Sequence, residues 1–82
     1  MEKKDIFNLI VSETTQLLPK LKDHSFQSED NFKNLGANSL DRTDIIESVM
    51  DELDLQVPRV AIFGAKNIGE LVDIFYQHAT KA

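Results

Sequence analysis

Apolar residues recur three and four positions apart in three segments of this 82-residue chain, which is the spacing of helices with one buried face. The first segment covers about residues 3–18, the second runs from Ser39 to about Leu53, and the third follows Asn67. A chain this short holds one domain with one modest core. The only run that would also suit a strand is residues 60–63. The spacing therefore predicts an all-α fold in a single domain over residues 1–82.

The first connection is long for so small a domain. Pro19 ends the first helix because its ring clashes with the preceding turn. Asn38 caps the second helix, and Asp41 completes a capping box three residues on. A loop as long as residues 20–37 is uncommon and is often functional. Residues 32–35 are expected to form a helical turn. Four apolar residues are spaced to anchor the loop to the core: Leu21, Phe26, Phe32 and Leu35.

Two further helices are expected near the C-terminus. Residues 59–63 are expected to form a short helix that ends at Gly64. Asn67 caps the last helix, with Glu70 three residues later. The boundaries together predict a small antiparallel four-helix bundle of three main helices and a short third helix.

The buried face of each main helix follows from the same spacing. In the first helix it comprises Ile6, Phe7, Leu9, Ile10, Val11, Thr14, Leu17 and Leu18. In the second it comprises Ile45, Ile46, Val49 and Leu53. In the last it comprises Ile68, Leu71, Val72, Ile74, Phe75 and His78. Met50 suits either the core or the exposed face of the second helix.

Negative charge is concentrated on the second helix. Six acids and one base lie between Asn38 and Asp54, so this segment carries −5, which equals the net charge of the whole chain. Proteins that bind nucleic acids carry basic surfaces, so the charge argues against that class. Most charge runs are solvated helix faces, but this concentration favours a partner that presents Lys and Arg.

Several kinds of site are excluded. The chain has no cysteine, hence no disulfide, no thiolate metal site and no cysteine nucleophile. Neither a membrane-length apolar run nor a cleavable leader is present, so we expect a cytoplasmic protein. Gly64 and Gly69 lack the Lys-Ser/Thr of a phosphate loop, and His24 and His78 lack a triad context. The acids of the second helix lack the spacing of a calcium loop, so no metal is expected.

Ser39 is the strongest candidate site. The stretch from Leu35 to Asp41 sets this serine after a Gly-Ala turn and a capping Asn38, at the first position of the acidic helix. Unpaired backbone N–H groups and the positive end of the helix dipole favour an anion there. Gly36 is three residues before Ser39 and no glycine follows closely, which excludes a nucleophile elbow. The motif therefore predicts an attachment point for a phosphate ester, although serine is also common at ordinary helix starts.

The chain resembles the acyl carrier proteins of fatty-acid and polyketide synthesis. The family's Gly-x-[Asp/Asn]-Ser-Leu core stands here as residues 36–40. Phe32 and Leu35 precede it, and the acidic helix and Val57-Pro58 follow, so the resemblance covers essentially the whole chain. It implies a four-helix carrier, not an enzyme, with 4′-phosphopantetheine joined to Ser39. A phosphopantetheinyl transferase would install the arm from coenzyme A with magnesium, and its thiol would hold acyl groups as thioesters.

In similar carriers the exposed face of the second helix docks on enzymes with basic patches, such as ketosynthases and acyltransferases. By position, Leu40 would supply an apolar contact there, and Asp41, Asp44 and Asp51 the charges.

Three residues depart from the usual family pattern. Asn38 stands where Asp is usual, Arg42 adds a positive charge one turn into the helix, and Glu47 occupies a face position that is often apolar. The short third helix lacks the acids common there. Phe63 either packs on the core or helps to recognise a partner, and we favour the core.

The string Gly-Ala-Asn-Ser-Leu-Asp-Arg is most similar to the free-standing donor carriers of polyketide β-branching cassettes. Those pass acetyl to an enzyme resembling HMG-CoA synthase, and the resemblance implies that role for a monomeric carrier. Two alternatives stay open. One is a general carrier of fatty-acid or polyketide extension. The other is a helical interaction module without a prosthetic group.

Overall fold

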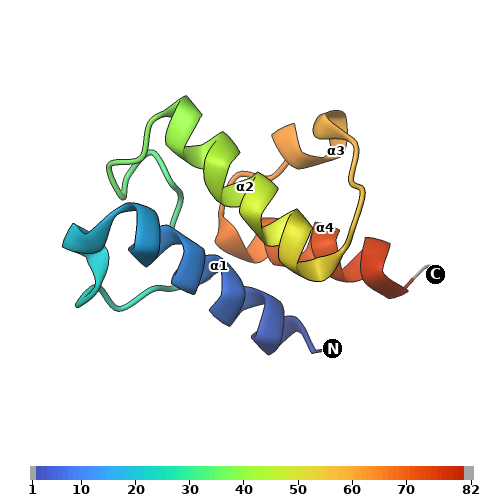
Figure 1. Ribbon diagram of the computed structural model, residues 1–82, viewed down its shortest axis with the longest axis horizontal. Coiled ribbons are helices and arrows are strands. Elements are labelled where there is room, and N and C mark those ends of the chain that lie inside the picture. The colour runs from blue at the N-terminus through green and yellow to red at the C-terminus, as the bar shows by residue number, and fades with distance from the viewer. Residues whose placement is uncertain (1, 81–82) are drawn as a thin grey trace.

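The computed structural model describes residues 2–80, and this range is entirely helical and irregular, without a strand. Its helices are α1 (Lys3–Leu17), α2 (Ser39–Leu53), α3 (Arg59–Phe63) and α4 (Ile68–Thr80). In Figure 1, α1 runs in the opposite direction to α2 and α4 and packs on both, while the short α3 lies against α4. The predicted all-α bundle with a short third helix is confirmed, and residues 60–63 are helical.

The end of α1 differs in one respect from the expectation. After Pro19 the chain makes one turn of 3₁₀ helix, η1 (Pro19–Leu21), where the sequence predicted only a loop. Proline suits the first position of such a turn, because the N–H that it lacks has no partner there. Pro19 therefore ends one helix and starts another.

The loop before α2 is fixed to the core as predicted. Phe32 and Leu35 are buried, while Leu21 and Phe26 are half-buried against the core. Residues 32–36 form a turn that begins with a bond from Leu35 N–H to Asn31 O (3.1 Å). The loop therefore has a defined path up to the start of α2.

The start of α4 is capped by a side chain and by the loop. Asn67 Oδ1 accepts from Glu70 N–H (2.8 Å), as predicted. In addition, Asp30 O accepts from Ile68 N–H (2.9 Å), so the loop satisfies a helix N–H that would otherwise lack a partner. This contact joins the loop to the first turn of α4.

The core draws on every helix and on the loop. Its buried apolar residues are Ile6, Ile10, Phe32, Leu35, Ala37, Ile45, Ile46, Val49, Val57, Ile62, Ile68, Leu71, Val72 and Phe75. Thr14 is also fully buried, with its hydroxyl donating to Ile10 O (2.7 Å). Leu17 was expected in the core but is 40% exposed, because it borders an open groove beside α2. The other residues predicted for the buried faces of the three main helices are buried or half-buried. No helix among the described residues has both the length and the apolar character to cross a membrane.

Candidate functional site

Ser39 is the first residue of α2, and its side chain is exposed. The residues around it form the predicted capping box. Asn38 Oδ1 accepts from Asp41 N–H (2.8 Å), and Asp41 Oδ2 accepts from Asn38 N–H (3.3 Å). The first helical bond, from Arg42 N–H, ends on Asn38 O (2.9 Å). Asn38 and Asp41 are therefore engaged with each other, and the Ser39 hydroxyl points into solvent without a partner among residues 2–80.

The N-terminus of α2 suits an anion. The N–H groups of Ser39 and Leu40 have no acceptor within the described part of the chain, as is normal for the first turn of a helix. The Asp41 carboxylate is turned to the Asn38 N–H, and Asn38 itself is neutral. A phosphate ester on Ser39 would therefore meet free N–H groups and the positive end of the helix dipole. The residues present fit such a group.

The turn before Ser39 requires a glycine, Gly36, and the side chain of Lys20, which is distant in the sequence, lies against it. Gly36 has φ +91°, which side-chain-bearing residues rarely adopt. Lys20 Nζ lies 2.9 Å from the point that a Cβ on Gly36 would occupy. Lys20 was not singled out from the sequence, because sixteen residues separate it from Gly36 and no local pattern links them.

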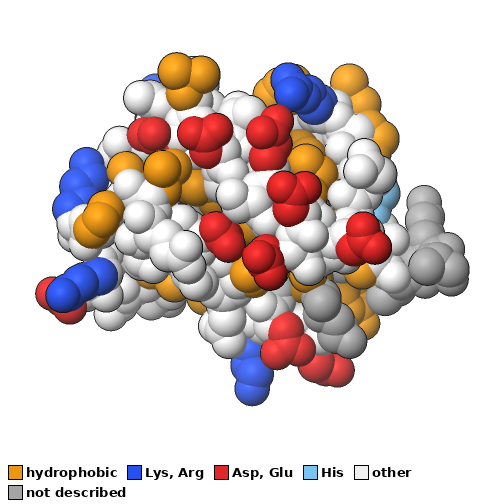
Figure 2. Space-filling model, viewed as in Figure 1, with side chains coloured by type: hydrophobic (Ala, Val, Ile, Leu, Met, Phe, Trp, Pro, Cys, Tyr) orange, Lys and Arg blue, Asp and Glu red, His pale blue; other side chains and the backbone are white. Residues whose placement is uncertain are grey.

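The outer face of α2 carries the acidic and apolar groups expected there. Leu40 is 75% exposed, Asp44 and Asp51 are exposed, and Asp41 is half-buried. Figure 2 shows acidic side chains gathered over the course of α2 on the face turned to the viewer, with orange apolar patches beside them. The structure thus brings these residues to one surface that begins at Ser39.

Two arginines connect α2 to α3, and the sequence did not predict these contacts. Arg42 Nη2 donates to Ile62 O (3.2 Å), the last-turn carbonyl of α3. Arg59 of α3 pairs with Glu47 of α2 (3.4 Å). Two of the residues that depart from the family pattern therefore have structural partners within the chain.

The expected burial of Phe63 was wrong. The side chain is 67% exposed, and the core position of α3 is taken by Ile62, which is 4% exposed. Consecutive helix residues lie about 100° apart, and in this five-residue helix Ile62 faces the core while Phe63 faces solvent. The Arg42 guanidinium lies 6.0 Å from the centre of the Phe63 ring. With Val60, which is 82% exposed, Phe63 makes the outer side of α3 apolar.

A small hollow of about 40 Å³ separates α2 from α3. Its lining includes Ile46 and Ile62 as well as the paired Glu47 and Arg59. Met50 is half-buried, contacts the core and also lines this hollow, so both interpretations of Met50 hold in part.

The histidines have structural contacts. His24 Nε2 lies 3.0 Å from Asp30 Oδ2, and His78 Nδ1 lies 2.9 Å from Ile74 O. A hydrogen bond from Gln27 N–H, together with the His24 contact, holds the pKa of Asp30 below its ordinary value. No group of three or more His, Cys, Asp or Glu side chains within residues 2–80 is arranged to hold a metal ion.

Comparison with known proteins gives consistent matches. The family model described as phosphopantetheine attachment site matches residues 10–75. The polyketide biosynthesis acyl-carrier-protein AcpK of Bacillus subtilis (strain 168) is 40% identical over 82 residues, which is the full length of both chains. The acyl carrier protein of Clostridium perfringens (strain 13 / Type A) is 34% identical over 47 residues, covering 57% of this chain and 62% of that protein.

A solved structure is similar as well. It is the crystal structure of the curacin biosynthetic pathway HMG synthase in complex with acetyl donor-ACP. One of its chains matches with a TM-score of 0.86 and 41% sequence identity, over 92% of this chain and 96% of that one.

Proposed function

The chain belongs to the phosphopantetheine-attachment family and is an acyl carrier protein, and from this premise we propose that Ser39 carries its 4′-phosphopantetheine arm. The exposed Ser39 hydroxyl at the first position of α2 is the observation that supports this site most directly. A transferase can reach a hydroxyl there, and the free N–H groups beside it favour the phosphodiester. When bound, the arm supplies the thiol that this cysteine-free chain lacks.

We propose that a phosphopantetheinyl transferase installs the arm from coenzyme A with magnesium. Ser39 Oγ forms the new bond to phosphorus, its proton is released, and the nucleotide part of coenzyme A leaves. No side chain within residues 2–80 hydrogen-bonds to Ser39 Oγ, so the hydroxyl is accessible to the transferase. That residues 1–82 form one monomeric carrier domain, and that it works in the cytoplasm, stay predictions.

We infer further that the arm carries acetyl to an HMG-CoA-synthase-like enzyme in polyketide β-branching. The full-length similarity to a polyketide carrier and to a chain of the acetyl donor complex supports this role. A small hollow of about 40 Å³ lies between α2 and α3, and an acetyl group needs no deep internal pocket.

The partner would dock on the face around Ser39. Leu40 and Phe63 provide exposed apolar contacts, and Asp44 and Asp51 suit a basic patch. The same surface includes the other proposed partner-binding residues, which are Asn38, Asp41, Arg42 and Glu47. Because Asn38 is neutral and α3 carries Arg59 but no acid, this face differs in charge from one that is acidic throughout. We propose that this difference selects the partner.

The partial match to the Clostridium perfringens carrier favours one competing function, that of a general carrier for fatty-acid or polyketide extension. A partner assay distinguishes the two roles. The arm is loaded with acetyl, and the carrier is offered separately to an HMG-CoA-synthase-like enzyme and to a chain-extending ketosynthase, with acetyl transfer followed by mass spectrometry of each enzyme. We expect efficient transfer to the synthase only. Transfer to the ketosynthase alone would reject the donor role.

Asn38→Asp is the matched variant for this assay. Aspartate retains the cap, so folding should be unchanged, while the added charge beside the phosphodiester should slow transfer to the synthase roughly tenfold. An unchanged rate would mean that Asn38 only caps the helix. The other alternative, an interaction module without a prosthetic group, is tested by attachment of the arm itself.

A further inference from the structure

Arg42 also lines a second hollow, of about 350 Å³, which none of the comparisons assigns to a ligand. Its walls come from the loop at residues 31–34, from Arg42 of α2, and from residues 65–67 with Leu71 at the start of α4. Buried Phe32 and Leu71 give it an apolar floor, to which the half-buried Ala65 adds. A volume of this size lies within the range of small-molecule sites, about 300–1,000 Å³.

Most of the polar side-chain groups around this hollow are hydrogen-bond donors. Lys33, Lys66 and Arg42 line it, and no acid does, in a chain that has 14 acids. The side-chain oxygens of two lining asparagines are already engaged: Asn31 Oδ1 accepts from Asn34 N–H (2.7 Å), and Asn67 Oδ1 from Glu70 N–H (2.8 Å). Their NH₂ groups remain available as donors. The hollow therefore favours a ligand that offers oxygen acceptors and some apolar surface.

The position of the hollow relative to Ser39 narrows the choice of ligand. Arg42 follows Ser39 by three residues, and side chains three apart on a helix are neighbours, with Cβ atoms about 5–6 Å apart. The hollow thus begins one helical turn from the attachment serine. The hollow between α2 and α3 also touches Arg42, but at about 40 Å³ it is much the smaller of the two.

We propose that the hollow lined by Lys33, Arg42 and Lys66 is the resting site of the pantetheine part of the arm, an inference that rests on the proposed attachment at Ser39. Pantetheine offers two amide carbonyls and a hydroxyl to these donors, and its dimethyl carbon suits the apolar floor. Held there, the arm is removed from solvent until a partner draws it out. In this arrangement Lys33 and Lys66 bind the arm, while the acids of α2 face the partner.

Because the chain has no cysteine, the arm carries its only thiol, and a nitroxide maleimide can label it alone. Paramagnetic broadening of the amide signals of ¹⁵N-labelled holo-protein then reports where the arm lies. We expect the strongest broadening at residues 31–34 and 65–67. Strongest broadening at residues 59–63, or a uniform decline with distance from Ser39, would overturn the proposal.

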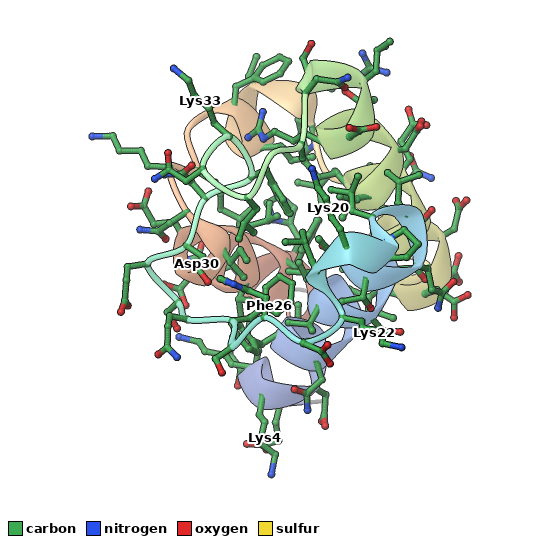
Figure 3. All side chains as sticks on the ribbon, turned by 90° about the vertical axis from the view of Figure 1, so that its left-hand side faces the viewer. Lys4, Lys20, Lys22, Phe26, Asp30 and Lys33 are labelled. Carbon is green, nitrogen blue, oxygen red and sulfur yellow. The ribbon has the colours of Figure 1, made fainter. Side chains whose placement is uncertain are left out.

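Lys33→Glu combined with Lys66→Glu is the decisive variant, because both side chains are exposed and line the hollow. We expect broadening at residues 31–34 to fall by at least half. Lys22→Glu is the control, since Figure 3 shows Lys22 apart from Lys33, which lies at the end of the molecule where α2 begins. Broadening that persists in the double variant would contradict the proposal. The intact mass separates the two claims: no added arm rejects the proposed function, and an arm that stays free of the hollow rejects this inference alone.

Discussion

Gly36 is the residue on which the geometry before Ser39 depends most. Its φ of +91° strains any residue with a side chain, and a Cβ there would lie 2.9 Å from Lys20 Nζ. We therefore predict that Gly36→Ala lowers the free energy of unfolding by about 1–2 kcal/mol, measured by urea denaturation.

Gly64→Ala is the matched control for that measurement. Gly64 has φ −74°, and an added Cβ would meet only Ala61 O at an ordinary 3.5 Å. This variant should be neutral or slightly stabilising. Equal losses of stability in the two variants would contradict the role assigned to Gly36.

For single residues, the sequence correctly predicted the contacts between side chains and backbone that lie close together along the chain. The cap on α2 joins Asn38 to Asp41, and the cap on α4 joins Asn67 to Glu70, both over three residues. The contacts that were missed join distant residues, such as Lys20 with Gly36 and Arg42 with Ile62. No periodicity specifies those pairs, because they exist only once the helices pack.

Among the helices, α3 is the one whose own backbone hydrogen bonds contribute least to its stability. It has five residues, too few for a stable isolated helix, and Arg42 donates a hydrogen bond to the Ile62 carbonyl in its last turn. We predict that Arg42→Ala raises amide hydrogen exchange several-fold across residues 59–65, while the free energy of unfolding falls by only about 1 kcal/mol.

Arg59→Ala tests whether the salt bridge to Glu47 matters as much. Both side chains are largely exposed, so the pair should contribute little, and exchange in α3 should stay near the level of the unmodified protein. Faster exchange in Arg59→Ala than in Arg42→Ala would show that Arg59, and not Arg42, is the main residue that stabilises α3.

The loop over the start of α4 should respond to acid. Asp30 accepts hydrogen bonds from Gln27 N–H (2.8 Å) and His24, which hold its pKa below the ordinary 3.8. Because the pKa is lower in the folded state, the contribution of this carboxylate to stability is complete above about pH 4. It is lost as the pH falls through the folded-state pKa.

An NMR titration from pH 6 to pH 2 measures this effect. The amide shifts of Gln27, Ile68 and Gly69 should change together with a midpoint below 3.8, since the backbone of the same loop holds the last two. Asp30→Asn should remove the step. A midpoint at or above 3.8 would mean that the hydrogen bonds to Asp30 do not persist in solution.

Element boundaries were predicted closely, and side-chain burial less so. Helices α2 and α3 begin and end where capping residues and glycine placed them, and α1 ends one residue earlier than expected. Phe63 was misplaced because apolar character in a very short helix does not say which residue faces the core. Leu17 was misplaced because periodicity continues to the end of α1, where packing against α2 gives way to an open groove.

On the scale of the whole molecule, the negative charge and the attachment site share one helix, α2. The acids of α2 carry a charge equal to the net −5, and Ser39 stands at the head of that helix. We predict that the dissociation constant for the synthase-like partner rises at least tenfold between 50 and 500 mM salt, measured by fluorescence anisotropy. Asp44→Lys with Asp51→Lys should weaken binding further and flatten the salt dependence. Binding that is indifferent to salt would rule out electrostatic docking through α2.

Attachment of the arm to Ser39 can be measured by intact-mass spectrometry. The purified protein is incubated with coenzyme A, magnesium and a broad-specificity phosphopantetheinyl transferase, beside Ser39→Ala and the control Ser25→Ala, which changes an exposed loop serine. We expect a gain of one phosphopantetheine in the unmodified protein and in Ser25→Ala, and none in Ser39→Ala. An arm on Ser39→Ala, or an unmodified protein that gains no mass while another carrier in the same reaction does, would contradict attachment at Ser39.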